Sequence, residues 1–463
     1  MKRRNFISLS LALISVKVFP LLSKEKDGEK YIALKELMQG KKDIVVPKGN
    51  YFITEPINIA SNTNLVFEEG AMIYVTAEAY VKCIFIINNA SHIKIIGGVF
   101  HALDDTCEVI NIKNASDSIS IDGLTCFGLR LGSITNEDNI RYACNDNIII
   151  TNCSGMAQSI RTRKAFLEFR YVHDSSCNKC NIKGYYHGLL FWGGDANPKH
   201  SKDRNKRCSN IILNNNHVYD VVKGGIWGSM AERVLITENY VENGGDVGID
   251  FEGCTGCVAS KNTVKYFKNG GLSTFFVCNN IVFEFNNIVC SDKTDAGAIF
   301  NSSQRRNNEN IIFRNNSFLS KSGISRFAQH GAVDDLLIEK NRFNNVAIKL
   351  DSNNNGDITI KDNSFYYSER IKYELRYIKI SNVNKPHAVI TIVGNDFKSI
   401  TDNTDSRMGV IEINKSKAPK VIIMNNTNNA DRHIKFELKI NAENTDKVLD
   451  NNSNITIETM NAN

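Results

Sequence analysis

The sequence predicts an all-β protein, a parallel β-helix (solenoid) that begins with a short capping helix. One motif recurs through the chain: an apolar β segment followed by Asn, any residue, and Val or Phe. Successive copies lie 22 to 32 residues apart, contain two or three short β segments and lack helical spacing. Such a period fits one coil of a β-helix, whose strands pair with those of adjacent coils ~4.8 Å away. The regular copies start at Asn216, Asn239, Asn262, Asn287, Asn316, Asn341, Asn363 and Asn395.

Two other repeat folds fit the pattern less well. A leucine-rich repeat has a similar period, but its L-x-x-L-x-L-x-x-N pattern is missing, and a propeller needs blades of ~40 residues. The variable intervals also suit a β-helix, because the turns between its strands can lengthen without disturbing the core. Asn at a fixed turn position tolerates a left-handed backbone and can form a ladder of side chains from coil to coil.

Residues 1–23 have the features of an export signal. Arg3 and Arg4 give a basic start, and residues 6–16 form an apolar core. The arginine pair and the residues after it resemble a twin-arginine signal, which directs export after folding. Lys17 interrupts the apolar run well before the ~20 residues that a spanning helix needs. We therefore expect a periplasmic or extracellular protein without a stable membrane span.

The formal net charge of +6 is concentrated at the N-terminus. Five basic and no acidic residues precede residue 25, and the rest of the chain carries 51 basic and 50 acidic residues. A nearly neutral chain has no general electrostatic reason to bind nucleic acid or an anionic membrane. We therefore expect neither as a partner.

The segment before the regular repeat supplies the cap and the first coils. Residues 31–38 have helical spacing, and Gly40, a usual helix stop, follows them. Short β segments punctuated by Gly, Asn, Ser and Pro come next, at 43–54, 57–59, 64–67 and 71–75.

This entry segment and the repeat together resemble the pectin-lyase-like superfamily of right-handed parallel β-helix proteins. The likeness includes Val46-Pro47-Lys48-Gly49-Asn50-Tyr51-Phe52-Ile53 and extends over nearly all of the chain after the signal. We expect one β-helix over 24–430, right-handed as in that superfamily, with closing strands or a cap at 431–463. The resemblance implies no single activity, since this fold carries lyases, hydrolases, epimerases and adhesins.

Twelve cysteines in an exported chain could form disulfides. Their placement favours buried free thiols, because Cys behaves as a small apolar residue and several occupy repeat positions that other copies fill with Ser, Asn, Ile or Val. A few disulfides remain an alternative. The two Cys-x-x-Cys pairs are 73 residues apart, far from zinc-ribbon spacing, so we expect no metal site. These pairs are Cys177 with Cys180 and Cys254 with Cys257.

The stretch 245–253 carries the densest candidate chemistry. A strand over this stretch would place its residues alternately on two faces. The apolar face would hold Val247, Ile249 and Phe251, and the opposite face Gly248, Asp250 and Glu252.

Asp250 and Glu252 are therefore candidate catalytic carboxyls, assisted by Asp246 at the start of the strand. Alternate strand residues lie ~6.5–7 Å apart, which is about the separation at which two carboxyls can flank a glycosidic bond. The pattern predicts acid/base work on a sugar.

Equivalent positions of stacked coils bring distant residues together. Counting eleven residues from the repeat Asn gives Trp227, Asp250 and Ser273, and we expect them to form one outward column. Counting thirteen gives the neighbouring column, Ser229, Glu252 and Phe275. Earlier coils add to this outer strip, so the predicted substrate-binding residues on it are Trp227, Trp192, Arg170, Glu168 and His187.

The composition of the strip suggests its ligand. Both tryptophans of the chain lie in it, and aromatic rings beside carboxylates suit sugars, which combine apolar C–H faces with hydroxyls. The insertion 193–207 is a cationic loop beside the strip, and its Lys202 and Arg204 could pair with an acidic polysaccharide.

Three functions fit the strip. In a glycoside hydrolase, Asp250 and Glu252 act as acid and as base or nucleophile, with no cofactor. In a uronate lyase, a cation such as Arg163 or Arg170, or calcium held by the three acids, neutralises the uronate carboxylate while a base removes the neighbouring proton. A non-catalytic protein would only bind the glycan. The sequence favours hydrolysis of a polysaccharide.

Overall fold

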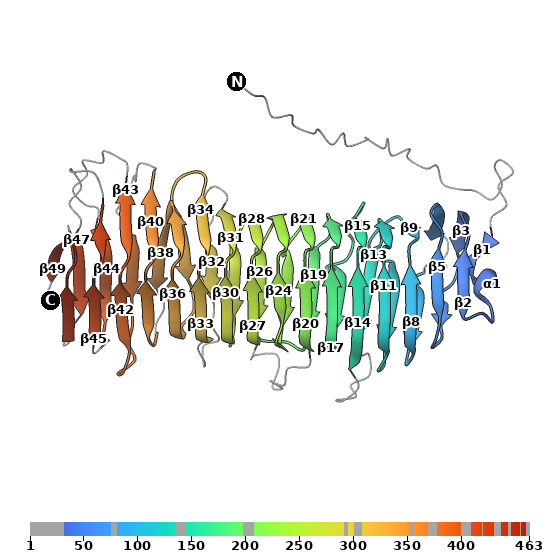
Figure 1. Cartoon of the computed structure of the whole chain (residues 1–463), viewed down its shortest axis with the longest axis horizontal. Helices are drawn as coiled ribbons and strands as arrows, with labels where there is room; N and C mark the ends of the chain where they lie inside the picture. Colours follow the sequence, from blue (N-terminus) through green and yellow to red (C-terminus); the bar gives the residue numbers. More distant parts are fainter. Residues whose placement is uncertain are drawn as a thin grey trace, which may run out of the picture.

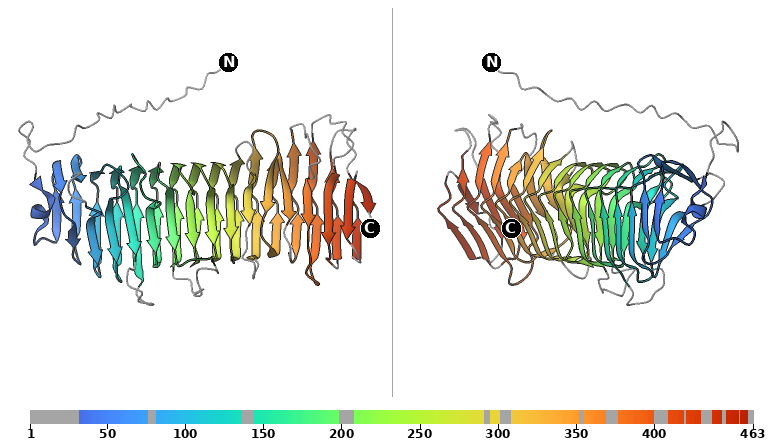
Figure 2. Two further views of the ribbon diagram at one scale, coloured as in Figure 1. Left: turned by 180° about the vertical axis from the view of Figure 1, so that it is seen from behind. Right: turned by 45° about the vertical axis from the view of Figure 1, so that its right-hand side comes forward.

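The chain is a β-solenoid whose coils stack along one long axis, as the computed structural model shows (Figure 1). The first and last described coils lie at opposite ends of this axis (Figure 2). The predicted parallel β-helix is confirmed. The structure describes residues 32–75, 81–135, 144–197, 208–290, 295–300, 308–351, 355–368, 377–399, 409–418, 420–429, 437–442, 446–453 and 455–459.

Three parallel sheets run along the solenoid, and each takes one strand from a typical coil. Sheet A extends from β1 (Ile32–Ala33) to β46 (Thr427–Asn428), and sheet B from β2 (Asp43–Val46) to β48 (Asp446–Asp450). Sheet C, which carries the candidate site, consists of β4 (Ile57–Ile59), β7 (Cys83–Asn88), β10 (Glu108–Lys113), β13 (Arg130–Thr135), β16 (Ala165–Arg170), β19 (His187–Trp192), β22 (Ile226–Ser229), β26 (Val247–Glu252), β29 (Gly270–Phe275), β32 (Asp295–Phe300), β35 (Ser325–Gln329), β38 (Val346–Asp351), β41 (Ile378–Ser381), β44 (Gly409–Ser416), β47 (Glu437–Ala442) and β49 (Thr456–Thr459).

The predicted capping helix is present as α1 (Leu34–Met38). Its buried Leu34 and Met38 are four residues apart, so both lie on the helix face that covers the first coils. Gly40 follows in the left-handed region at φ 74°, where a residue with a Cβ is strained. No helix in the described part of the chain is long and apolar enough to cross a membrane.

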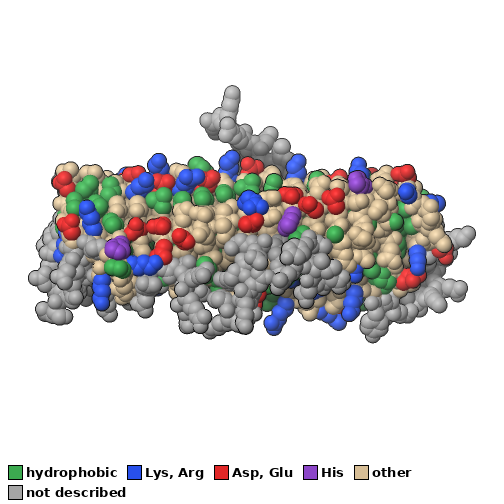
Figure 3. All heavy atoms as spheres, turned by 90° about the horizontal axis from the view of Figure 1, so that it is seen from below, with side chains coloured by type: hydrophobic (Ala, Val, Ile, Leu, Met, Phe, Trp, Pro, Cys, Tyr) green, Lys and Arg blue, Asp and Glu red, His purple; other side chains and the backbone are tan. Residues whose placement is uncertain are grey.

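Acidic and basic side chains are interspersed on the face that Figure 3 presents, in keeping with the nearly neutral composition after residue 25. The predicted export signal lies outside the described residues.

Side chains along sheet C alternate between the core and the outer face, with one informative exception. In β26, Ile249 and Phe251 are fully buried in the core. The prediction that Val247 joins them is wrong: Val247 lines the outer face, and Gly248 packs inward. A Cβ on Gly248 would lie 2.2 Å from Cγ1 of Val264, so only glycine fits there. The same close approach recurs in the two preceding coils, at Gly188 and Gly225.

A ladder of buried asparagines joins the coils at the turn before the sheet A strands. The Oδ1 atom of Asn239 accepts hydrogen bonds from the backbone N–H of Asn216 at 2.9 Å and from its Nδ2 at 3.0 Å. The Nδ2 atom of Asn239 donates to the Leu213 carbonyl and to Oδ1 of Asn262, both at 2.9 Å. The amide is thus satisfied although Asn239 is buried. The ladder contains Asn216, Asn239, Asn262, Asn286, Asn316, Asn341, Asn363, Asn395, Asn426 and Asn452.

One member of the predicted series is wrong by a single position. Asn286, and not Asn287, belongs to the ladder: it is buried and hydrogen-bonded to Asn262 and Asn316. Asn287 is the first residue of the next strand, β31 (Asn287–Cys290), and is exposed. Because two asparagines are adjacent here, the repeat motif can be aligned on either of them. The turn directs the side chain of Asn286 into the core, so Asn286 is the ladder residue.

The cysteines confirm the expectation of buried thiols. All twelve are free, and all but Cys144 are buried. Cys177 and Cys180 lie with their Sγ atoms 3.6 Å apart. Burial raises the pKa of Cys208 to about 12, so this thiol is inert at neutral pH. Within the described residues, no group of three or more His, Cys, Asp or Glu side chains is arranged to hold a metal ion.

The ladder predicts a sharp contrast between two neighbouring asparagines. Asn286→Ala removes the amide that accepts a hydrogen bond from the buried Asn262 N–H and donates one to the Ala259 carbonyl. It also removes one of the hydrogen bonds made by the side chains of Asn262 and Asn316. We expect the free energy of unfolding in urea to fall by ~2–4 kcal/mol. Asn287→Ala is the matched control and should change it by less than about 0.5 kcal/mol. Equal losses in the two variants would contradict the assignment of Asn286 to the ladder.

Candidate active site

The stacking of the coils produces both predicted columns. Trp227 in β22 pairs with Asp250 in β26, which pairs with Ser273 in β29. In the neighbouring column, Glu252 lies between Ser229 and Phe275. Residues that are 23 positions apart in the sequence are therefore direct neighbours on the outer face of sheet C.

A cleft of about 350 Å³ opens over these columns. Its floor is low at Gly224, because a glycine leaves the outer position without a side chain; a Cβ there would lie 3.1 Å from Nδ1 of His187. Both predicted carboxyls and the assisting Asp246 line the cleft. The full lining consists of His187, Lys223, Gly224, Trp227, Asp246, Val247, Asp250, Glu252, Asn269, Phe275 and Phe276.

A third column, which the sequence analysis missed, forms the rim toward sheet A. Lys223, Asp246 and Asn269 stack in successive coils, with backbone hydrogen bonds from Asp246 N to Lys223 O and from Asn269 N to Asp246 O. The Lys223 ammonium lies 3.3 Å from one Asp246 oxygen, and Nδ2 of Asn269 donates to the other at 2.7 Å. Each residue is seven positions after a repeat Asn, so the same counting that found the other columns would have found this one.

Asp250 occupies the deepest position among the three acids. Its side chain faces the cleft, yet the residue is only 7% exposed, and its Oδ1 atom is buried without a hydrogen-bond partner. Burial raises the pKa of Asp250 well above its ordinary value, and the neighbouring Glu252 and Asp246 raise it further. These surroundings favour the protonated form of Asp250.

Glu252 titrates closer to neutrality. Burial raises its pKa to about 7, with further upward contributions from Asp195 and Asp246. A hydrogen bond from the Trp227 indole and the charge of Lys223 favour the carboxylate and lower the pKa. Both carboxyls in the cleft thus have a raised pKa, and ionisation of Glu252 opposes ionisation of Asp250.

His187 is a neutral wall of the cleft. Burial, followed by the charge of Lys223, lowers the pKa of His187 to about 4. Its Nδ1 atom accepts a hydrogen bond from the Gly224 N–H at 3.2 Å, and its ring stacks on Trp227 with centroids 5.2 Å apart. The imidazole is fixed in orientation and offers a flat surface without charge.

Trp192 and Arg170 lie on the coils that precede Trp227, on the side away from the acids, and do not line the cleft. The two indole rings meet edge to face at 5.7 Å, and the Arg170 guanidinium lies over Trp192 at 5.4 Å. Glu168 lies deeper than the predicted strip implied: it is 2% exposed, and its oxygens accept hydrogen bonds from Arg170 Nε at 2.8 Å and from Ala165 N at 3.0 Å. Glu168 is placed to hold Arg170.

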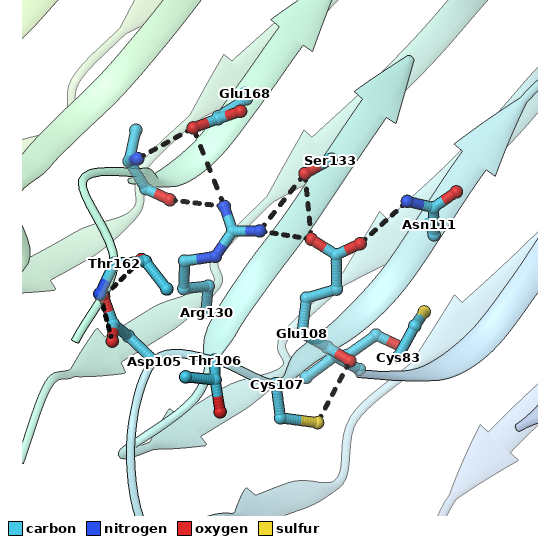
Figure 4. Close-up of polar contacts among 12 residues, drawn as sticks. Cys83, Asp105, Thr106, Cys107, Glu108, Asn111, Arg130, Ser133, Thr162 and Glu168 are labelled. Atoms are coloured by element: carbon cyan, nitrogen blue, oxygen red, sulfur yellow. Dashed lines mark hydrogen bonds and ion pairs between the residues drawn. The ribbon is translucent and has the colours of Figure 1, made fainter. Parts of the chain in front are cut away.

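A buried charge cluster supports Glu168 from the preceding coils (Figure 4). Arg130 lies between Glu168, at 3.8 Å, and Glu108, to which it is hydrogen-bonded. Ser133 Oγ donates to Glu108 at 2.8 Å, and Arg130 also donates to the Ala165 carbonyl at 2.9 Å. Sequence analysis missed Arg130 and Glu108, although the register pairs them at the start of β13 and β10.

The remaining predicted residues lie on the loop after Trp192. Its first part, as far as residue 197, lies beside the outer face of sheet C, where Gly194 O accepts a hydrogen bond from Ser229 Oγ at 2.8 Å. Lys202 and Arg204 lie outside the described residues.

Comparisons with known proteins establish the fold and nothing finer. The chain matches no model of a known protein family and no curated protein sequence. Its structure is similar to the surface adhesin PfbA of Streptococcus pneumoniae, with a TM-score of 0.52 and 13% identity over 68% of this chain and 86% of that one. It is also similar to the A-module of the Azotobacter vinelandii mannuronan C-5 epimerase AlgE6, with a TM-score of 0.52 and 9% identity over 84% and 91% of the two chains. The resemblance to parallel β-helix proteins is confirmed.

The raised pKa of Asp250 predicts a pH-dependent effect on stability. A carboxyl whose folded pKa is raised contributes stability that is complete below its unfolded pKa of ~3.9 and is lost as pH rises through the folded pKa. Asp250→Asn, which cannot ionise, should therefore be more stable than the wild type at pH 8, by on the order of 1–3 kcal/mol, and nearly equal to it at pH 4. Thermal melts across this range measure the difference.

Asp246→Asn is the control, because it breaks the contact with Lys223 and should not stabilise the protein at pH 8. If Asp250→Asn lost the same amount of stability at every pH, ionisation of the buried Asp250 carboxyl would not cost the wild type any stability.

Proposed function

We propose that the protein is a glycoside hydrolase that cleaves a polysaccharide with Asp250 and Glu252 as its carboxyl pair. The observation that supports this most directly is that both carboxyls leave one strand into one cleft, where burial raises the pKa of each. Glycosidic cleavage needs one protonated carboxyl and one carboxylate, and environments that raise two pKa values unequally supply both.

Asp250 is the general acid in this proposal. It is the more deeply buried of the two, burial raises its pKa well above the ordinary value, and its side chain lines the cleft. Its proton passes to the glycosidic oxygen as the bond between that oxygen and the anomeric carbon breaks. Glu252, as the carboxylate, takes a proton from the attacking water or itself attacks the anomeric carbon.

The surrounding residues suit a sugar ring. Trp227, His187, Phe275 and Phe276 give the cleft flat apolar surfaces, while Lys223, Asp246 and Asn269 give it a polar rim. Pyranose rings present apolar C–H faces and hydroxyl edges, so such a mixture binds them. A uronate finds less support here, because the Lys223 ammonium on this rim is already paired with Asp246. Export through residues 1–23 would bring the enzyme to extracellular or periplasmic glycans.

Incubation of the purified protein with a panel of neutral and acidic polysaccharides tests the proposal. We expect new reducing ends without the ultraviolet absorbance of an unsaturated uronate. Asp250→Asn and Glu252→Gln should each lower kcat by roughly 10²–10⁴-fold, because each removes a proton-transfer group. Unsaturated products would indicate a lyase instead, and binding without cleavage would indicate a glycan-binding protein.

The pH profile gives a second test. Activity should fall as the pH drops below about 7, because Glu252 then becomes protonated, and should fall again at high pH as Asp250 loses its proton. Trp227→Phe removes the hydrogen bond that favours the Glu252 carboxylate, so its pKa rises and the acidic limb moves to higher pH. Trp192→Phe is the control and should leave the limb in place. A limb that stays fixed in Trp227→Phe would contradict the assignment of Glu252.

A further inference from the structure

A continuous wall of rings bounds the cleft on the side toward the N-terminal coils. The Tyr186 and His187 rings meet edge to face at 5.0 Å, and His187 stacks on Trp227 at 5.2 Å. Trp227 meets Trp192 at 5.7 Å, and Arg170 covers Trp192 at 5.4 Å. We call Tyr186, His187, Trp227 and Trp192 the aromatic wall, in which each ring contacts the next.

The wall extends across the full width of the outer face of sheet C. Tyr186 lies at the rim toward sheet A, where its carbonyl accepts a hydrogen bond from Lys223 N at 2.8 Å. His187 begins β19, and Trp192 ends it. Trp227, on the next coil, stands between them and the acids. A glycan that runs along the solenoid axis therefore meets one ring in each outer column of these two coils, from His187, Trp227 or Trp192.

The acids lie on the coil that follows the wall. Trp227 and Asp250 are register partners, so their strands are ~4.8 Å apart. The cleft volume of about 350 Å³ is near the lower limit of sites that enclose a small molecule, ~300–1,000 Å³. The cleft itself thus has room for a short unit of a chain, and its lining toward the N-terminal coils ends at His187 and Trp227.

Buried charges make the wall rigid. The Nε atom of Arg170 is held by Glu168, and Glu168 is held by Arg130 and by the N–H of Ala165. Arg130 is 2% exposed and is bound to Glu108 (Figure 4). Rotation of Arg170 away from Trp192 would leave the buried Glu168 with less compensation, which costs free energy.

We propose that the aromatic wall closes one end of the cleft, so that the enzyme is exo-acting and removes short units from a chain end whose terminal sugar rests against Trp227. This inference rests on the proposed hydrolase function. It assigns to Trp192 and Arg170 the role of positioning residues, which act through Trp227 and not on the reacting atoms.

The test uses the polysaccharide on which the wild-type protein releases reducing ends. Product size and solution viscosity are followed from the first turnovers. We expect one short product from the start, with the polymer remaining long and the viscosity falling slowly. The double variant Trp192→Ala with Arg170→Ala opens the wall, and we expect loss of the single-product pattern and the appearance of intermediate oligosaccharides.

Tyr366→Ala serves as the control, because it removes an exposed aromatic ring on sheet A, distant from the cleft, and should leave the product pattern unchanged. Far-ultraviolet circular dichroism shows whether the double variant folds. If it does not fold, the product pattern of the wild type still tests the proposal. A rapid fall in viscosity with random fragment sizes in the wild type would overturn the exo assignment and leave the hydrolase intact. Absence of any cleavage across the panel would overturn the hydrolase and the exo assignment with it.

Discussion

The register between coils depends on the hydrogen bonds that pass through the buried asparagine ladder. Each ladder amide accepts a hydrogen bond from the backbone N–H of the ladder Asn in the preceding coil and donates one to a backbone carbonyl of that coil. It also donates to the amide oxygen of the ladder Asn in the next coil, so these buried polar groups are satisfied from coil to coil. A shift of one residue would break several of these bonds at once and would turn the core residues of a strand outward. Because the register is fixed, Trp227, Asp250 and Ser273 have no alternative to standing in one column.

The cleft arises from an irregularity superimposed on this regular stack. At Gly188, Gly225 and Gly248 the chain packs so closely against the core that a Cβ would clash, and the residue before each glycine faces outward. His187, Gly224 and Val247 therefore belong to the outer face, and the missing side chain at Gly224 leaves the hollow. Two of these coils also carry Lys223 and Asp246 of the polar rim, so a local packing constraint and the ionisable groups meet in one place.

The carboxyls in the cleft have electrostatic surroundings that destabilise their charged forms. Asp250 is buried with an unpartnered oxygen, and both it and Glu252 have a raised pKa, which means that ionising them opposes folding. Glu108, Arg130 and Glu168 show the opposite arrangement, since they are buried as paired charges with hydrogen bonds to satisfy them, and the partly exposed Arg170 also pairs with Glu168. Burial of the long apolar core offsets the cost of both sets of buried ionisable groups. Groups with strongly shifted pKa values are typical of functional sites.

The fold, the approximate coil boundaries and the two columns that contain Trp227, Asp250 and Glu252 were predictable from the order of residues alone. These follow from a repeat, and a repeat is local information that stacking converts directly into neighbours. Four features became clear only from the packing of the coils: Asn286 and not Asn287 joins the ladder, Val247 faces the cleft, Glu168 lies beneath Arg170, and Lys223 pairs with Asp246. Each of these depends on which way a side chain turns against the adjacent coils, and on how much water those coils exclude, and no single coil contains that information.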